Sequence, residues 1–402
     1  MRFFPVTVFL FSVPAIFVNA QSNKNPIITA VPTLLINDNA VTNGMGEIGA
    51  VATEYNNAAY FQNPALLARN KKVLTGYFTY IPWLRTLVPD INILHAGIVY
   101  SPDGKNGFSY SMCYKSMGKV TFSSPTGTTI EYYRPREVFN SIRYARALSN
   151  NFSIGIGYKY IYSQLNNNKS GVHAGDLGAD YRFKRNIGER KDLRINLGAI
   201  AMNMGQKVSY YPGRYDFLPA VLKVGGMSSI NKNMENNNTL TFSLAYQAQK
   251  LLVPSPYIAD PSNNYEIIAG RDPNVGVAAG MFGSFTDAPG IPVKDAQGNY
   301  QYNPDGTVQI EKGSVLQEEL NEIIHQFGME ARYFYSERDL SLAFRSGYFH
   351  DHEFKGNKKF ITTGIGTQWK AFSLDLSYYI PIEKRHPLAN TIIISLCYRF
   401  FK

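Results

Sequence analysis

The stretch from Thr391 to Phe401 constrains the fold most strongly, because its side chains alternate between two kinds. One set of alternate positions is large and apolar: Ile392, Ile394, Leu396, Tyr398 and Phe400. The other set is mostly polar, with Ile393 as the exception: Thr391, Ser395, Cys397 and Arg399. A period of two residues predicts a β-strand with one apolar face. A soluble protein rarely ends on such a strand, whereas a membrane barrel must pair its last strand with its first, so we interpret it as a closing strand.

Earlier segments repeat this pattern, and fourteen strands are predicted in all. They are 72–80, 91–100, 107–117, 139–148, 152–164, 173–183, 193–203, 220–229, 239–249, 325–335, 340–350, 359–369, 371–380 and 390–401. The connections alternate in length: 118–138 and 250–324 are long, whereas 101–106 and 149–151 are short. Long outer loops, short periplasmic turns, an even strand number and both termini on the periplasmic side are typical of outer-membrane barrels. The sequence therefore predicts an all-β fold, a transmembrane outer-membrane β-barrel of about 14 antiparallel strands.

The composition agrees with a barrel and argues against other classes. Hydrophobic residues make up 45% of the 402 residues and aromatic residues 14%, which suits aromatic girdles at the membrane interfaces. Past residue 20, no apolar run approaches the roughly 18 residues of a membrane-spanning helix. The net charge of +10 comes from scattered Lys and Arg residues. This distribution favours contact with anionic lipid or lipopolysaccharide head groups over binding of nucleic acid.

Four regions are expected along the chain. Residues 1–20 have the charge, apolar run and small-residue end of a secretory signal peptide. Residues 21–70 precede the first good alternation and are predicted to be an N-terminal plug or periplasmic segment. Residues 71–402 form the barrel, and 250–324 is an extracellular loop insertion within it. Cys113 and Cys397 are predicted to be free thiols, because three strand spacings, roughly 14 Å, exceed the reach of a disulfide.

No motif in the sequence indicates catalysis, a cofactor or a metal. The segment 44–49 matches a dinucleotide-binding glycine pattern, but no βαβ unit surrounds it, and its glycines are expected to allow close packing of the plug. His350 and His352 lack a third ligand nearby in sequence. The chain also has no G-x-S-x-G motif. We therefore predict that the protein is not an enzyme.

Two outer loops carry apolar residues that soluble surfaces avoid. The segment 280–290 contains Met281, Phe282 and Phe285, and Ser314 with Gln317 is expected to form a capping box for a short helix. That helix is predicted at 315–324, with Leu316, Leu320, Ile323 and Ile324 on one face. The loop 80–90 contains one of two Trp residues beside an Arg. Such anchors suit a protein partner, although a lid over the barrel or anchoring in lipid also remains open.

Several segments resemble known families. Gly44-Met45-Gly46 followed by Asn63-Pro64-Ala65-Leu66 resembles the N-terminal pattern of the FadL-like barrel superfamily, whose members have fourteen strands and an N-terminal plug. The segments 29–32, 82–92 and 280–290 resemble the PorV family, also called LptO, of the Bacteroidota type IX secretion system. The likeness runs from about residue 28 to the C-terminus.

The resemblance implies a non-enzymatic outer-membrane component of type IX secretion with loops exposed on the cell surface. It would bind the translocon barrel and shuttle cargo with C-terminal signal domains to an attachment complex that contains a sortase-like subunit. Nine residues are predicted to contact these partners: Trp83, Leu84, Arg85, Met281, Phe282, Phe285, Asp287, Leu316 and Leu320. The alternatives are a FadL-like transporter of hydrophobic solutes such as fatty acids, which needs an apolar pocket between plug and wall, and a lipid-modifying enzyme.

Overall fold

The structure is a computed structural model that describes residues 25–53, 61–69, 73–85, 88, 90–123, 129–260, 266–382 and 388–401. The predicted signal peptide, residues 1–20, lies outside these ranges. Within them, no helix combines the length and the apolar character needed to cross a membrane.

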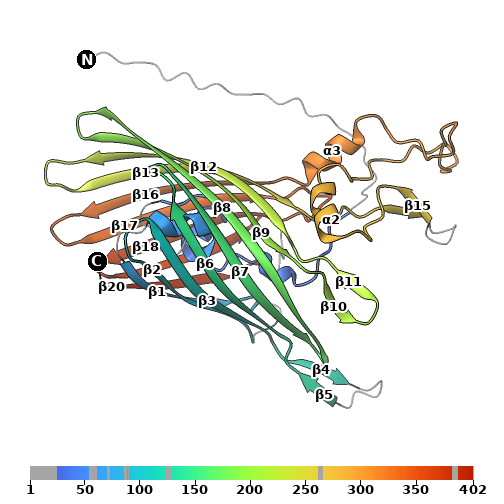
Figure 1. Ribbon diagram of the computed structural model, residues 1–402, viewed down its shortest axis with the longest axis horizontal. Coiled ribbons are helices and arrows are strands. Elements are labelled where there is room, and N and C mark those ends of the chain that lie inside the picture. Colours follow the sequence, from blue (N-terminus) through green and yellow to red (C-terminus); the bar gives the residue numbers. More distant parts are fainter. Residues whose placement is uncertain are drawn as a thin grey trace.

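The fold is a closed barrel of fourteen antiparallel strands, as the alternation predicts (Figure 1). The strands are β1(Val73–Pro82), β2(Ile91–Ser101), β3(Asn106–Met117), β6(Arg136–Ala147), β7(Phe152–Leu165), β8(Asn168–Gly188), β9(Lys191–Gly205), β12(Val221–Asn233), β13(Thr239–Leu251), β16(Ile324–Tyr335), β17(Leu340–His350), β18(Lys359–Trp369), β19(Phe372–Pro381) and β20(Ile392–Phe401). All fourteen predicted strands are confirmed. The largest error is at β8, which continues to Gly188 and pairs with β9 in a tight hairpin where the sequence indicated a longer turn.

Pairing of the last strand with the first closes the barrel. The register runs from Tyr80 opposite Ile394 to Leu74 opposite Phe401. The two ends of the barrel differ, as expected: the long connections leave one end, which we call the long-loop end, and most short turns lie at the other, the short-turn end. The β7–β8 connection was expected to be long but is a two-residue turn at the long-loop end, because β8 already begins at Asn168, opposite Leu165. Closure leaves no unpaired sheet edge, which is the condition for a β-structure to span a membrane.

The outer face of the wall is apolar. Large side chains remain exposed on strands all around the barrel, for example Ile98 at 51%, Leu244 at 54% and Ile365 at 58%. Water disfavours so large an apolar surface, whereas lipid solvates it. The barrel therefore belongs in an outer membrane.

The inner face is polar, and many of its charges are paired. Arg345 Nε lies 2.7 Å from Glu330, Arg345 Nη1 lies 2.8 Å from Asp375, and Arg332 Nη2 lies 3.1 Å from Glu330. These side chains are almost fully buried, apart from the slightly exposed Asp375. Buried charges of this kind persist only when they are paired and hydrogen-bonded.

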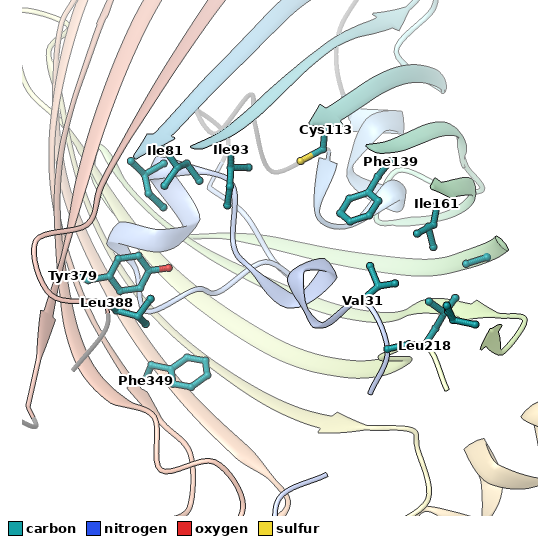
Figure 2. Packing of buried hydrophobic residues seen from close by; sticks show 14 of the residues in the cluster. Val31, Ile81, Ile93, Cys113, Phe139, Ile161, Leu218, Phe349, Tyr379 and Leu388 are labelled. Carbon is teal, nitrogen blue, oxygen red and sulfur yellow. The ribbon is translucent and has the colours of Figure 1, made fainter. Parts of the chain in front are cut away.

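The described part of the segment from Ala30 to Arg69 lies inside the barrel as a plug (Figure 1). It contains the 3₁₀ helices η1(Pro32–Leu35) and η3(Pro64–Arg69) and the short helix α1(Ala40–Gly44). Asn39 caps α1, because its Oδ1 accepts hydrogen bonds from the amides of Val41 and Thr42. Figure 2 shows apolar side chains of the wall pointing towards plug residue Val31 and its neighbours. Ile393 belongs to this cluster, which explains the apolar exception on the inner face of β20.

Glycines allow the plug and the wall to approach backbone to backbone. Gly46 has φ 73°, and a Cβ there would lie 2.5 Å from the carbonyl oxygen of Phe327 on β16. A Cβ on Gly347 of β17 would lie 2.0 Å from the Gly46 amide nitrogen. The glycine-rich motif therefore serves packing, as expected, since a side chain at either position would collide with backbone.

The plug enters the lumen from the long-loop end, which corrects one expectation. The Asn25 amide donates to the carbonyl oxygen of Phe354, in the connection between β17 and β18, at 2.9 Å. The C-terminal residue Phe401 lies opposite Leu74 at the short-turn end. The described chain therefore starts and finishes at opposite ends of the barrel, whereas both termini were expected on the same side.

The long connections carry small elements of their own. Three hairpins stand beyond the wall: β4(Val120–Ser123) with β5(Thr129–Tyr133), β10(Val208–Tyr211) with β11(Arg214–Asp216), and β14(Ile258–Asp260) with β15(Glu266–Ala269). The connection from β13 to β16 also contains the helices α2(Val277–Gly283) and α3(Ser314–Asn321). Cys113 on β3 and Cys397 on β20 do not form a disulfide with each other, as predicted.

Candidate partner-binding surface

A buried ion cluster fixes the β13–β16 connection to the rim of the barrel. Lys250 Nζ, at the end of β13, lies 3.0 Å from a Glu319 carboxylate oxygen and 2.5 Å from Glu322. Lys355 Nζ, from the β17–β18 connection, lies 2.6 Å from Glu318 and 3.0 Å from Glu322. Removing one partner from a buried pair leaves an uncompensated charge, which costs about 3–5 kcal/mol. Helix α3 is therefore held firmly in one orientation.

The same carboxylates clamp the segment that follows α2. Glu319 accepts a hydrogen bond from the Ala288 amide at 2.9 Å, and Glu318 accepts one from the Gly290 amide at 2.9 Å. Hydrogen bonds to these side chains thus connect α3 to the segment after α2, in addition to the backbone, and the two helices form one unit.

Helix α3 buries its acidic side and exposes its apolar side. Glu319 and Glu322 are 8% and 5% exposed, whereas Leu316 and Leu320 are 65% and 55% exposed. The two leucines are four residues apart and share a helix face. A helix on a water-soluble surface normally has the opposite polarity, with apolar residues towards the core. Packing within the described chain does not explain why this apolar face points outward.

The predicted start and end of this helix are wrong. Helix α3 begins at Ser314 with Gly313 as the N-cap, and no side-chain cap is made. Ser314 is not a cap because its Oγ donates to the Glu311 carbonyl oxygen and accepts from the Ile291 amide. The helix ends at Asn321, so Ile323 follows it and Ile324 already belongs to β16.

The segment predicted as an exposed loop is in part helix α2. Gly280 packs against Phe217, since a Cβ there would lie 2.9 Å from the ring. This contact turns Phe282 outward, where it is 79% exposed, and Met281 is half-buried. Phe285 is 46% exposed and its ring centroid lies 6.0 Å from Lys250 Nζ, the cation that also binds Glu319. Phe285 therefore lies close to the buried, acidic side of α3.

Asp287 was also predicted to contact a partner, but it is not exposed at the surface with these residues. Its side chain is buried, and Ser255 hydrogen-bonds to it. Burial raises the pKa of the Asp287 carboxyl, an effect that the Ser255 hydrogen bonds partly offset. In this structure Asp287 connects the segment that follows α2 to Ser255.

Trp83, Leu84 and Arg85 lie in a different part of the long-loop end. Four strands, β17 to β20, separate β16 from β1, where this loop begins. The Trp83 ring packs edge-on against Tyr379, with centroids 6.3 Å apart, and so faces the lumen cluster and not lipid. Leu84 is half-buried, and exposed Arg85 donates to the Tyr80 hydroxyl at 3.2 Å.

We define the α2–α3 surface as Phe282, Phe285, Leu316 and Leu320. Its anchors were missed by sequence reasoning: Lys250, Lys355, Glu318, Glu319 and Glu322. Part of the signal was present, because Ser314, Glu318 and Glu322 recur every four residues opposite the leucines. Lys250 comes from the end of β13 and Lys355 from the β17–β18 connection, and only the fold brings both to α3.

The lumen contains a small polar cavity between plug and wall, of about 60 Å³. Charged side chains contribute much of its lining: Asp38, His95, Lys115, Arg143, Lys159 and Lys223. His95 Nδ1 lies 3.0 Å from Asp38. This cavity is not the apolar pocket that a hydrophobic-solute transporter needs. In the described parts of the chain, no three His, Cys, Asp or Glu residues come together as a metal site would require.

These features define a class: a plugged outer-membrane barrel with an anchored apolar surface on its long loops. The chain belongs to the PorV family, since the family model described as type IX secretion system protein PorV matches residues 19–258, more than half of the 402 residues. It is thus an outer-membrane component of type IX secretion.

Among solved structures, the CymD monoaromatic hydrocarbon channel is 11% identical, with 91% of this chain and 97% of that chain covered and a TM-score of 0.45. A Pseudomonas aeruginosa FadL homologue is 10% identical, with 94% and 99% covered and a TM-score of 0.41. Likenesses this weak carry no argument about function. No curated protein matches the chain.

Proposed function

We propose that this protein is a non-enzymatic adaptor in type IX secretion. The α2–α3 surface would stand outside the cell and bind the translocon barrel or the C-terminal signal domain of a secreted cargo. The adaptor would then pass the cargo to an attachment complex that contains a sortase-like subunit.

The outward apolar face of α3 carries this proposal. Full burial of one leucine or phenylalanine side chain is worth about 1.5–3 kcal/mol, and a few such residues dominate a typical protein interface. The buried Lys–Glu cluster holds the face in place before any partner arrives. A partner therefore loses little free energy to ordering the surface.

The arrangement of the barrel supports an adaptor over a conduit. Long loops are on the outside in barrels of this kind, and the α2–α3 surface would then lie where exported proteins appear. The plug occupies the lumen, and the cavity beside it is small and charged. The hydrophobic-solute alternative therefore has no observation in its favour here.

The test is a double substitution, Leu316→Ser with Leu320→Ser, in a tagged full-length chain. Both side chains are exposed, so the barrel should assemble normally. Recovery of translocon or cargo with the tagged chain from outer membrane should fall at least about tenfold, because hot-spot residues contribute 2 kcal/mol or more.

Tyr302→Ser is the matched control, since Tyr302 is 60% exposed in the same connection but lies outside α2 and α3. It should leave recovery unchanged. Deleting 278–290 is a coarser test, because it also removes the amides that Glu318 and Glu319 hold. Normal recovery and cargo release with the double variant would refute the proposed surface.

A further inference from the structure

The outer wall of the barrel carries an apolar depression of about 800 Å³ across strands β9 to β18. Small residues point outward from β12, at Gly226 and Ser228, and from β17, at Ser346. Large apolar side chains stand beside them: Ile195, Leu197, Leu244, Tyr246, Phe327, Met329 and Ile361. On β12, Gly226 lies between Leu197 and Tyr246 of the neighbouring strands, and Ser228 lies between Ile195 and Leu244. The depression therefore extends across the wall, from β9 to the strands β16, β17 and β18.

A row of basic side chains lies just above this depression, at the long-loop end. His325 of β16 is opposite His350 of β17, and His350 is opposite Lys359 of β18. These three residues have the same parity as Phe327, Tyr348 and Ile361, which line the depression, and therefore point outward too. They lie two residues higher on their strands, a rise of about 7 Å. That level, at the strand ends, is where a bilayer has its head groups.

Tyrosine hydroxyls orient both histidines. The Tyr246 hydroxyl is 2.8 Å from His325 Nδ1, and the Tyr348 hydroxyl is 3.0 Å from His350 Nδ1. A hydroxyl that donates to Nδ1 leaves the ring proton on Nε2, which then donates outward. Two N–H donors and the Lys359 ammonium on adjacent strands match the oxygen atoms of one phosphate.

We propose that this face binds one phosphate-bearing anionic membrane lipid. The phosphate would lie on His325, His350 and Lys359, and an acyl chain would lie in the depression, whose lining includes Phe327, Tyr348 and Ile361 directly below this row. Charge complementarity at the rim, continuous with an apolar channel below, selects an anionic lipid over a neutral one. The inference goes beyond the adaptor function and involves neither α2 nor α3.

Native mass spectrometry of the full chain in detergent tests the lipid preference. We expect about tenfold better retention of dipalmitoylphosphatidylglycerol than of dipalmitoylphosphatidylcholine, which has the same chains and no net charge. Sodium phosphate at the same concentration should not displace the lipid. Equal retention of the two lipids, or displacement by phosphate alone, would overturn the proposal.

Variants separate the two halves of the site. His325→Gln, His350→Gln and Lys359→Gln together should abolish the preference for the anionic lipid, and Ser228→Phe should lower retention by filling the channel. His173→Gln is the control, because His173 pairs with Tyr158 in the same way, at 2.6 Å, but is not part of this row. Unchanged preference in the triple variant would refute the site. Loss of a co-purifying protein, with lipid retention unchanged, would show that the face binds protein instead.

Discussion

The plug–wall interface and the α2–α3 surface are built by opposite rules. Inside the barrel, glycines let backbones touch, and every charge of the Glu330–Arg345 network has a partner. On α3 the charged side is again paired and buried, but the leucines on the other side remain more than half exposed. Complete internal pairing indicates a structural role, whereas a rigid apolar face without an internal partner indicates an external one. Substitutions in the two regions should therefore separate stability from binding.

The largest expected effect on stability is from Glu330→Gln. The isosteric amide leaves Arg332 and Arg345 without their shared buried counter-charge, and the free energy of unfolding should fall by about 3–5 kcal/mol. Urea unfolding of the purified barrel in detergent measures it. Glu235→Gln is the control, because its ion pair with Arg190 is exposed and should contribute less than about 1 kcal/mol. Equal effects of the two substitutions would contradict the conclusion that the buried ion pairs of Glu330 stabilise the barrel.

A smaller loss is expected from Gly347→Ala. The added methyl group meets the Gly46 backbone, so plug and wall must separate, at a cost of about 1–3 kcal/mol. The shift of the folded band on unheated gels, followed with temperature, reports this loss. Gly188→Ala, where a Cβ meets nothing within 4 Å, should have no such effect. Gly347→Ala protein that folds correctly should still bind its partner proteins normally. Loss of partner binding without loss of stability would contradict the separation between the plug–wall interface and the α2–α3 surface.

The smallest effect concerns pH and Asp287. Burial raises the pKa of this carboxyl in the folded state, so the fold binds its proton more tightly than the unfolded chain does. The stabilisation is therefore present at low pH and is lost as pH rises through the folded pKa. Asp287→Asn mimics the protonated form. Hydrogen exchange of the amides in 284–290 should match wild type in acid and be slower than wild type at neutral pH.

Asp305→Asn is the control for this measurement, since Asp305 is exposed elsewhere in the same connection. It should leave those amides unchanged at either pH. A ratio of exchange rates between wild type and Asp287→Asn that stays constant with pH would show that Asp287 is not buried in solution.

Much of the fold was predictable because a membrane barrel imposes one simple rule on each strand. Outward residues must be apolar and inward residues mostly polar, so residues such as Leu244 and Ser243 identify both strand and face without any knowledge of neighbours. Apolar residues on the inner face could be explained only from the structure. Ile393 is apolar on the inner face because the plug lies against it.

The alternation along the chain by itself determined the strand number, the closing pair and the apolar exterior, because each depends on residues two positions apart. The tertiary structure decided which exposed-looking residues are truly exposed: it buried Asp287, turned Trp83 towards the lumen and left Leu316 and Leu320 facing outward. The orientation of α3 depends on Lys250 and Lys355, which the fold brings to its glutamates, and that of Trp83 depends on Tyr379 of β19. Contacts between distant segments have no periodic signature, so no local pattern can encode them.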